Sequence, residues 1–142
     1  MTPVVRFADV EALTKAWALS STVAPLLTRT DGGVSIYLSM PASAPIPALT
    51  MTRVGGAPRR RQDLPVDYAR MRFSCWGRSR QQAGDIARAL VAELESLGHT
   101  DGFDNGDARL TAAEVINLFW LPDPESDTAR YVVDALIAAV ST

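Results

Sequence analysis

One stretch in the middle of the chain constrains the fold most, because a strand pattern runs directly into a helix pattern. From Tyr68 to Trp76, "YARMRFSCW", apolar residues alternate with polar and aromatic ones, as in a half-buried β-strand. Ser79 and Gln82 then have the spacing of a helix capping box, and Gly98 supplies a helix stop. Between these ends, apolar residues recur with helical spacing at Ala83, Ile86, Ala87, Leu90, Val91, Leu94 and Leu97.

The remaining patterns predict a second helix and four more strands. The helix is expected from Asp9, a candidate N-cap, to Leu19. The strands are expected at Val34 to Met40, Ala48 to Val54, Ala113 to Leu121 and Ala129 to Ala139. The last segment is alanine-rich and fits a helix as well as a strand, so both interpretations stay open.

Together these elements predict an α+β fold: a single domain over residues 1–142, with a mostly antiparallel sheet packed by two helices. A chain of 142 residues has the usual size of one domain. Apolar residues make up 47% of it and charged residues 21%, as in ordinary globular proteins. No apolar run reaches the length of a membrane span, so we expect no membrane partner.

Charge is distributed unevenly along the sequence. The segment from Arg53 to Arg80 has a net charge of +6, whereas the segment from Glu93 to Asp134 has a net charge of -8. If the folded molecule keeps this polarity, the basic surface of one copy can contact the acidic surface of another. Such head-to-tail contacts close into rings or continue as filaments. The alternative is that the strands bring the opposite charges together within one molecule.

Residues that catalyse reactions are scarce. The one histidine, His99, falls in a polar stretch after the second predicted helix, and histidine is the usual general base at neutral pH. The one cysteine, Cys75, falls on the apolar side of its strand, where a small buried residue is expected rather than a nucleophile. Neither zinc-ligand spacing nor a glycine-rich nucleotide motif occurs. We therefore expect no catalytic, cofactor-binding or metal-binding residues, no cofactor and no enzymatic activity.

The stretch "DGFDNGD", Asp101 to Asp107, has the look of a calcium-binding loop. With Gly106 at the sixth position, Phe103 and Ala112 fall at the third and twelfth positions, where oxygen ligands are required. Asn105 followed by glycine is instead typical of the tight turn of a hairpin. The sequence predicts a turn here and no calcium site.

Three consecutive arginines stand in "GGAPRRRQDLP", Gly55 to Pro65. The glycine pair is expected to end the preceding strand, which makes this stretch a mobile loop in the free chain. The arginines suit a nucleic-acid contact, a contact with an acidic protein surface, or a solvated turn. A pI of about 5.3 and an aromatic content of 7% argue against nucleic acid.

Five features follow one another between Ile46 and Leu94: a proline-bounded strand, an Arg-x-Gly-Gly end, an arginine-containing loop, a strand ending in Trp76-Gly77, and an alanine-containing helix. In this order they resemble the tail-terminator, or tail-completion, proteins of long-tailed phages, especially phages of actinobacteria. The resemblance implies a small α+β domain that assembles as a hexameric ring at the head-proximal end of the tail tube. Such a ring ends tail growth and joins the tail to the head connector.

The resemblance also implies partners and a location. The partners are further copies in a homohexamer, the tail tube protein and a head–tail connector protein, with DNA passing through the lumen without specific binding. The protein is implied to reside in the tail or neck of the virion after assembly in the host cytoplasm. The implied protein interface comprises Arg59, Arg60, Arg61, Asp63 and Arg53.

Two alternatives remain at this point. Another neck or connector ring protein shares the size and the oligomeric habit. A small host enzyme or ligand-binding domain requires a pocket with convergent polar groups.

Overall fold

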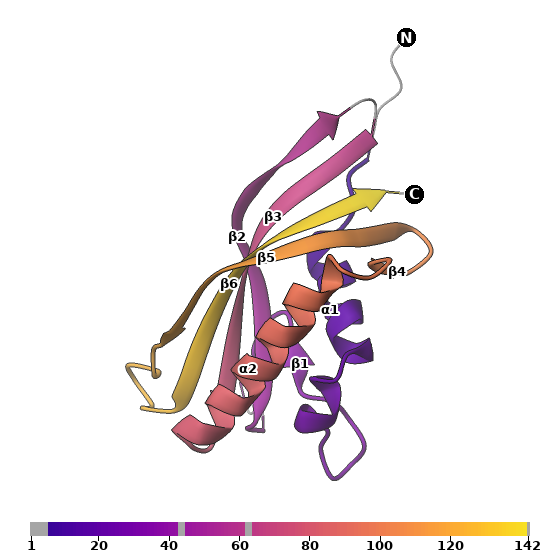
Figure 1. Ribbon diagram of the computed structural model, residues 1–142. Helices are drawn as coiled ribbons and strands as arrows, with labels where there is room; N and C mark the ends of the chain where they lie inside the picture. The colour runs from indigo at the N-terminus through magenta and orange to yellow at the C-terminus, as the bar shows by residue number, and fades with distance from the viewer. Residues whose placement is uncertain (1–5, 43–44, 62–63, 142) are drawn as a thin grey trace.

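The computed structural model describes residues 6–42, 45–61 and 64–141 (Figure 1). Two α-helices, one 3₁₀ turn (η1) and six strands follow one another along the chain. Their bounds are α1 Val10–Ser20, η1 Ala24–Leu27, β1 Ile36–Tyr37, β2 Ala48–Arg61, β3 Leu64–Gly77, α2 Arg80–Leu97, β4 Phe103–Asp104, β5 Ala108–Trp120 and β6 Ala129–Ser141.

The strands form one sheet in the order β1-β2-β3-β6-β5-β4. Only β1 and β2 pair in parallel, and the other neighbours are antiparallel. The predicted α+β fold with a mostly antiparallel sheet is therefore confirmed. The segment that also fitted a helix is strand β6, which lies between β3 and β5 and is paired on both sides. Its small alanines leave room for helix α2 above the sheet, which explains why an alanine-rich sequence serves as a central strand here.

Both helices begin where the sequence predicts. The Oδ1 atom of Asp9 accepts a hydrogen bond from the backbone N–H of Ala12 at 3.1 Å, which caps α1. The Oγ atom of Ser79 accepts from the backbone N–H of Gln82 at 3.1 Å, which caps α2. The Gln82 side chain accepts from the N–H of Arg78 instead of returning to the cap residue, so the capping box is only half formed.

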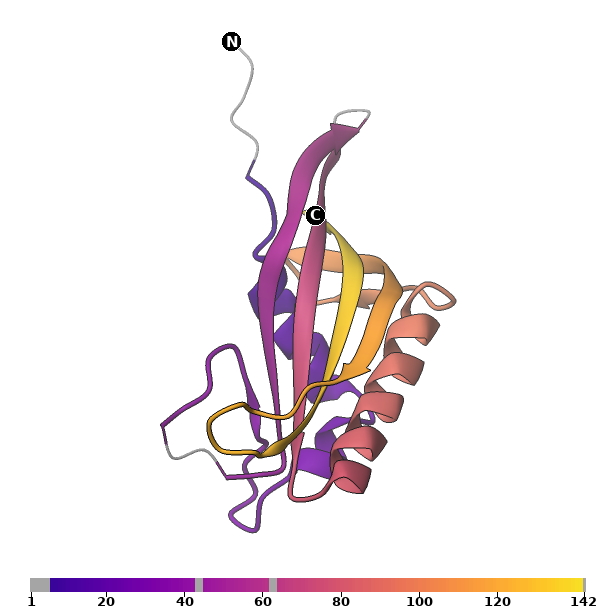
Figure 2. The same ribbon diagram turned by 90° about the vertical axis from the view of Figure 1, so that its left-hand side faces the viewer.

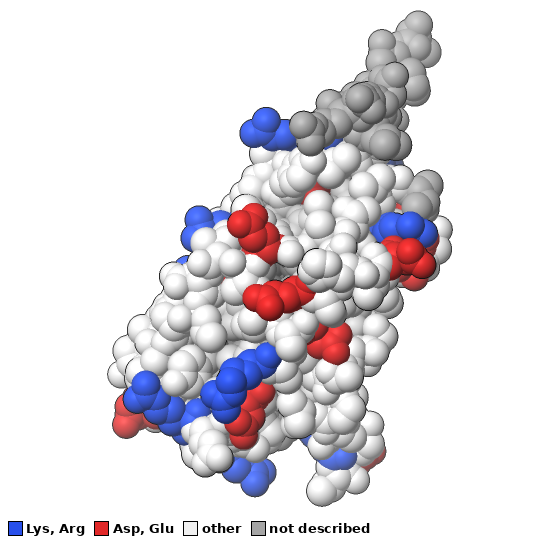
Figure 3. All heavy atoms as spheres, in the orientation of Figure 1, with Lys and Arg blue, Asp and Glu red and all other residues white. Residues whose placement is uncertain are grey.

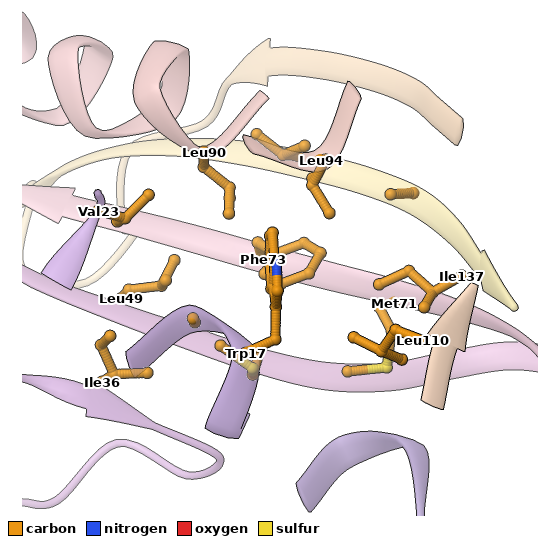
Figure 4. Packing of buried hydrophobic residues seen from close by; sticks show 14 of the residues in the cluster. Trp17, Val23, Ile36, Leu49, Met71, Phe73, Leu90, Leu94, Leu110 and Ile137 are labelled. Carbon is orange, nitrogen blue, oxygen red and sulfur yellow. The ribbon is translucent and has the colours of Figure 1, made fainter. Parts of the chain in front are cut away.

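The helices cover one face of the sheet and leave the other without a helix (Figures 1 and 2). In Figure 4, Leu90 and Leu94 of α2 point toward Phe73 at the centre of β3, and Trp17 of α1 approaches Phe73 from the opposite direction. All four side chains belong to one buried apolar cluster. Cys75 is buried in it too, as its position in the strand predicts.

Strand β2 does not end at the glycine pair, so the predicted loop from Gly55 to Pro65 is wrong for residues 55–61 and 64–65. A β-bulge between Arg53 and Gly55 shifts the register, and pairing with β3 then continues as far as Arg61. Gly56 has a φ of 86°, and a Cβ at this position would lie 2.0 Å from the carbonyl oxygen of Tyr68. The glycines therefore bend the strand instead of ending it. Pro58 is tolerated because it lies on an edge, beyond the two residues of β2 that pair with β1.

The first predicted strand, Val34 to Met40, is shorter than its alternation suggests. Only Ile36–Tyr37 pairs with β2, and Thr28 forms an isolated bridge with Val34. The chain turns away directly afterwards into a connector that contains Pro41, Pro45 and Pro47, and prolines cannot donate a hydrogen bond to a strand ladder.

Leu90 provides a test of the core. It is fully buried between α2 and the sheet, so Leu90→Ala should lower the free energy of unfolding by about 2–5 kcal/mol in urea denaturation. Leu121→Ala, at a leucine that is 43% exposed, should cost less than about 1 kcal/mol. Equal losses in the two variants would contradict this packing.

Candidate assembly surfaces

The end of the β2–β3 hairpin projects beyond the rest of the sheet, as Figure 2 shows. β3 pairs with β6 only from Val66 onward, whereas β2 and β3 pair with each other up to Arg61 and Leu64. We call residues 58–61 and 64–65 the arm. At Arg60, Arg61, Leu64 and Pro65 its two strands have no third neighbour, so the backbone of the arm is available to other molecules there.

The predicted interface residues lie in different surroundings. Arg59, Arg60 and Arg61 are consecutive residues of β2 within the arm, and the side chain of Arg59 is exposed. Asp63 lies outside the described residues. Arg53 lies at the base of the arm, on the helix-covered side of the sheet, and is bound within the chain. The structure therefore places the three consecutive arginines in the arm and separates Arg53 from them.

Arg53 forms a two-pronged ion pair with Asp67 across the hairpin. Its Nη1 and Nη2 atoms donate to the two carboxylate oxygens of Asp67 at 2.6 and 2.7 Å, and its Nε atom donates to the Gly55 carbonyl at 3.0 Å. The Glu11 side chain accepts from the Arg53 backbone N–H at 3.2 Å. The hydrogen bonds to Asp67 raise the pKa of Arg53 above its usual value. The partly buried Arg53–Asp67 pair fixes the bulged base of the arm to β3, and the Glu11 hydrogen bond fixes it to α1.

Sequence reasoning missed Asp67, although a usable signal was present. Asp67 falls on the same side of β3 as Ala69, Met71 and Phe73, all of which are buried. An acid on an apolar face requires a cationic or hydrogen-bonding partner.

The predicted charge polarity is partly cancelled inside the molecule. Asp134 of β6 is buried, and Arg72 of β3 donates to both of its carboxylate oxygens at 2.9 and 3.0 Å. The Arg70 guanidinium lies 3.7 Å from the same carboxylate. The hydrogen bonds from Arg72, together with the charges of Arg72 and Arg70, lower the pKa of Asp134. The basic and acidic segments thus meet at this point on the uncovered face of the sheet. Figure 3, which displays the helix-covered face, shows blue and red groups side by side there too.

The face without helices has a hollow of about 200 Å³ over β3, β6 and β5. Two rows of paired residues frame it: Tyr68, Ala138 and Ala112 in one, and Arg70, Leu136 and Glu114 in the other. Three small alanines, Ala112, Ala113 and Ala138, line the depression. Its lining is largely apolar, and Glu114 is its one ionisable carboxylate among the described lining residues.

At the opposite end of the sheet, arginines stack on aromatic rings. Arg80 lies 4.6 Å from the ring centre of Trp120 and 5.9 Å from that of Tyr131, and Arg130 lies 4.8 Å from that of Trp76. The contacts of Arg80 tie the start of α2 to β5 and β6, and the contact of Arg130 with Trp76 links β6 to β3. They give these arginines a role in holding the fold.

The described residues contain no group of three or more His, Cys, Asp or Glu side chains that is suited to a metal ion. Burial raises the pKa of the Cys75 thiol well above its usual value, so the reactive thiolate is suppressed. His99 is exposed after α2. The Asn105-Gly106 pair forms the predicted turn, between β4 and β5, and the Asn105 side chain accepts from the N–H groups of Asp107 and Ala108. None of the described helices is long and apolar enough to span a membrane.

The Asp134 pair predicts a pH-dependent stability. Folding lowers the pKa of the Asp134 carboxyl. Its ion pairs therefore stabilise the folded state above the unfolded pKa of about 4, and this stabilisation is lost as the pH falls through the folded pKa. Asp134→Asn should therefore lower the free energy of unfolding by about 1.5–3 kcal/mol at pH 7, and the difference from wild type should shrink near pH 3. Urea unfolding at pH 7 and near pH 3 measures the loss of unfolding free energy and its decrease at low pH. Asp101→Asn, in an exposed loop, should change stability by less than about 0.5 kcal/mol, and a pH-independent effect of Asp134→Asn would contradict the account.

Comparisons with known proteins agree with the resemblance found in the sequence. A search of curated proteins finds no match. Among solved structures, the chain is similar to a chain of the "Virion of native gene transfer agent (GTA) particle", with a TM-score of 0.66 and 14% sequence identity. The similarity covers 94% of this chain and 95% of that one, and at this identity it establishes the fold alone.

The family evidence covers nearly the whole chain. The family model described as "Tail completion protein gp17" matches residues 11–138, from the start of α1 to the last residues of β6. All the strands and both helices therefore fall largely or wholly within the match. The chain belongs to the tail completion protein gp17 family, a family of structural proteins of phage tails.

Proposed function

We propose that this tail protein forms a homohexameric ring at the head-proximal end of the tail tube, where it ends tail growth and joins the tail to the head connector. The observation that carries the proposal is the family match over residues 11–138. Its partners in this proposal are further copies of itself, the tail tube protein and a connector protein. Assembly takes place in the host cytoplasm before the protein becomes part of the tail or neck.

The shape of the molecule supports a role in assembly. A two-stranded hairpin in water is marginally stable on its own, so the arm gains most from contact with another surface. The Arg53–Asp67 pair fixes its base, which means that the arm meets a partner as a preformed extension. A preformed arm avoids part of the ordering cost of about 1–2 kcal/mol per residue that a free loop has on binding.

The chemistry of the arm indicates the kind of surface that it meets. Arg59, Arg60 and Arg61, with Asp63 beside them in sequence, are proposed to contact acidic protein surface on a neighbouring subunit or the tail tube. Arg53 contributes to this interface by holding the arm in position. DNA in the lumen is a weaker partner, because the chain has a net charge of -2.

Another neck or connector ring protein is the second candidate, since it needs the same kind of subunit contacts. The position of the ring along the particle separates the two. The enzyme alternative has lost ground, because the family is one of structural tail proteins.

Native mass spectrometry over a concentration series, with and without purified tail tubes, tests the ring. We expect a closed species of six subunits that is favoured by tubes, because exposed ion pairs contribute only about 0–1 kcal/mol each and a template supplies additional contacts. High salt should weaken the free ring. A protein that stays monomeric in both conditions contradicts the proposal.

A second experiment tests the arm. The triple substitution Arg59→Glu, Arg60→Glu and Arg61→Glu should leave the Tm of the monomer nearly unchanged, because the arm lies outside the core, and should block ring formation or tail joining. The matched variant with lysine at the three positions keeps the charge and should retain most assembly. Normal assembly of the glutamate variant would show that the arginines are only a solvated end of the hairpin.

A further inference from the structure

The hollow on the uncovered sheet face has the size and lining of a socket for one apolar side chain. Its volume of about 200 Å³ exceeds the roughly 150 Å³ of an apolar cavity that holds benzene. Leu136 at its edge is 38% exposed, in the middle of a sheet that no helix covers on this side. Exposed apolar surface of this kind marks interaction sites.

A second apolar patch lies on the opposite side of the molecule, where α1 ends and η1 follows. Leu19 is 43% exposed and Leu26 is 47% exposed, whereas neighbouring Val23 and Leu27 are buried in the core. We call Leu19 and Leu26 the helix corner. It belongs to the helical layer, whereas the hollow belongs to the other face of the sheet.

Two different patches on opposite sides are the requirement for head-to-tail assembly. In such a contact one surface of each copy meets a different surface of the next, so the contact propagates, and it closes into a ring when the rotation between neighbours closes. A symmetric dimer would instead need one patch that is complementary to itself.

The charges around the two patches are complementary. On the sheet, Arg70 and Glu114 flank Leu136 as its partners on β3 and β5. At the helix corner, Lys15 lies one turn before Leu19 in α1, and the Glu93 carboxylate binds the Thr22 hydroxyl just after α1. Arg70 is already engaged by the Asp134 carboxylate and Glu93 by Thr22, so the complementary charges across the contact are Glu114 beside the hollow and Lys15 beside the corner.

We infer that the hollow receives the helix corner of a second copy of this chain, which makes the sheet face and the helical layer the two sides of the subunit contact. This inference rests on the proposed ring and specifies how its subunits meet. Apolar contact at Leu19 and Leu26 supplies most of the affinity, and the flanking charges set the orientation.

Cross-linking tests the contact directly. Cys75 is buried, so the wild-type protein is a control that a bis-maleimide linker should leave uncoupled. The double variant Leu136→Cys with Leu26→Cys should give a covalent ladder that ends at the ring, because each copy joins two neighbours. Either single variant alone should stay uncoupled, and a mixture of the two single variants should stop at dimers.

The outcomes separate the inference from the proposed function. A ring in native mass spectrometry without a ladder overturns the inference and leaves the proposed ring intact. Dimers from Leu136→Cys alone indicate a symmetric contact, and coupling of this variant to the tube protein indicates a different occupant, so either result also overturns it. A wild-type protein that never forms a ring overturns both.

A matched pair of substitutions provides a second measurement. Leu26→Asp places a charge in the proposed contact and should raise the concentration for half-maximal assembly at least about tenfold, as expected for a residue at the centre of an interface. Leu121→Asp makes the same change outside both patches, at a leucine that is 43% exposed against 47% for Leu26. This control should change the concentration for half-maximal assembly by less than about twofold. Equal effects of the two substitutions would contradict the inference.

Discussion

The pairing of β3 along both of its edges is the constraint on which the rest of the structure depends. It pairs with β2 as far as the end of the hairpin and with β6 from Val66 onward. The β2–β3 pairing therefore continues past the point where β6 ends, and the end of the arm has no third strand beside it. Phe73 and Met71 of the same strand anchor the core, so one strand both holds the helices and extends the hairpin toward other molecules.

The core is one-sided, and this determines which surfaces remain for assembly. Both helices bury their apolar faces against the same side of the sheet, and the opposite side keeps partly exposed residues such as Leu136 beside the ion pairs of Asp134. A sheet with one free face satisfies its backbone hydrogen bonds within the chain while leaving side chains for a partner. In the proposed ring, this face is the surface that receives the neighbouring copy.

Cap residues and apolar periodicity predicted the parts of the fold that local sequence alone determines. The caps at Asp9 and Ser79 and the apolar stripe of α2 required no knowledge of the tertiary structure. The extension of β2 was missed because glycine and proline end strands in the middle of a sheet but only bend them at an edge, and sequence does not say which strand is the edge. The state of β6 stayed open because alanine fits a helix and a crowded central strand equally well.

The candidate site was predictable only in part, for the same reason. The arginine run was visible in the sequence, and its place on a projecting arm agrees with a contact role. The pairs of Arg53 with Asp67 and of Arg72 with Asp134 join different strands, so they depend on register, which sequence patterns do not supply. The hollow likewise arises from alanines of β5 and β6 that become neighbours only in the folded sheet.

Electron cryomicroscopy of tails assembled with this protein tests the central claim most directly. The account predicts a closed ring of six copies at the head-proximal end of the tube, with the sheet face of each copy against the helices of the next and the arms in contact with a neighbour or the tube. A single copy, an open arrangement, or a ring at the other end of the tail would contradict it.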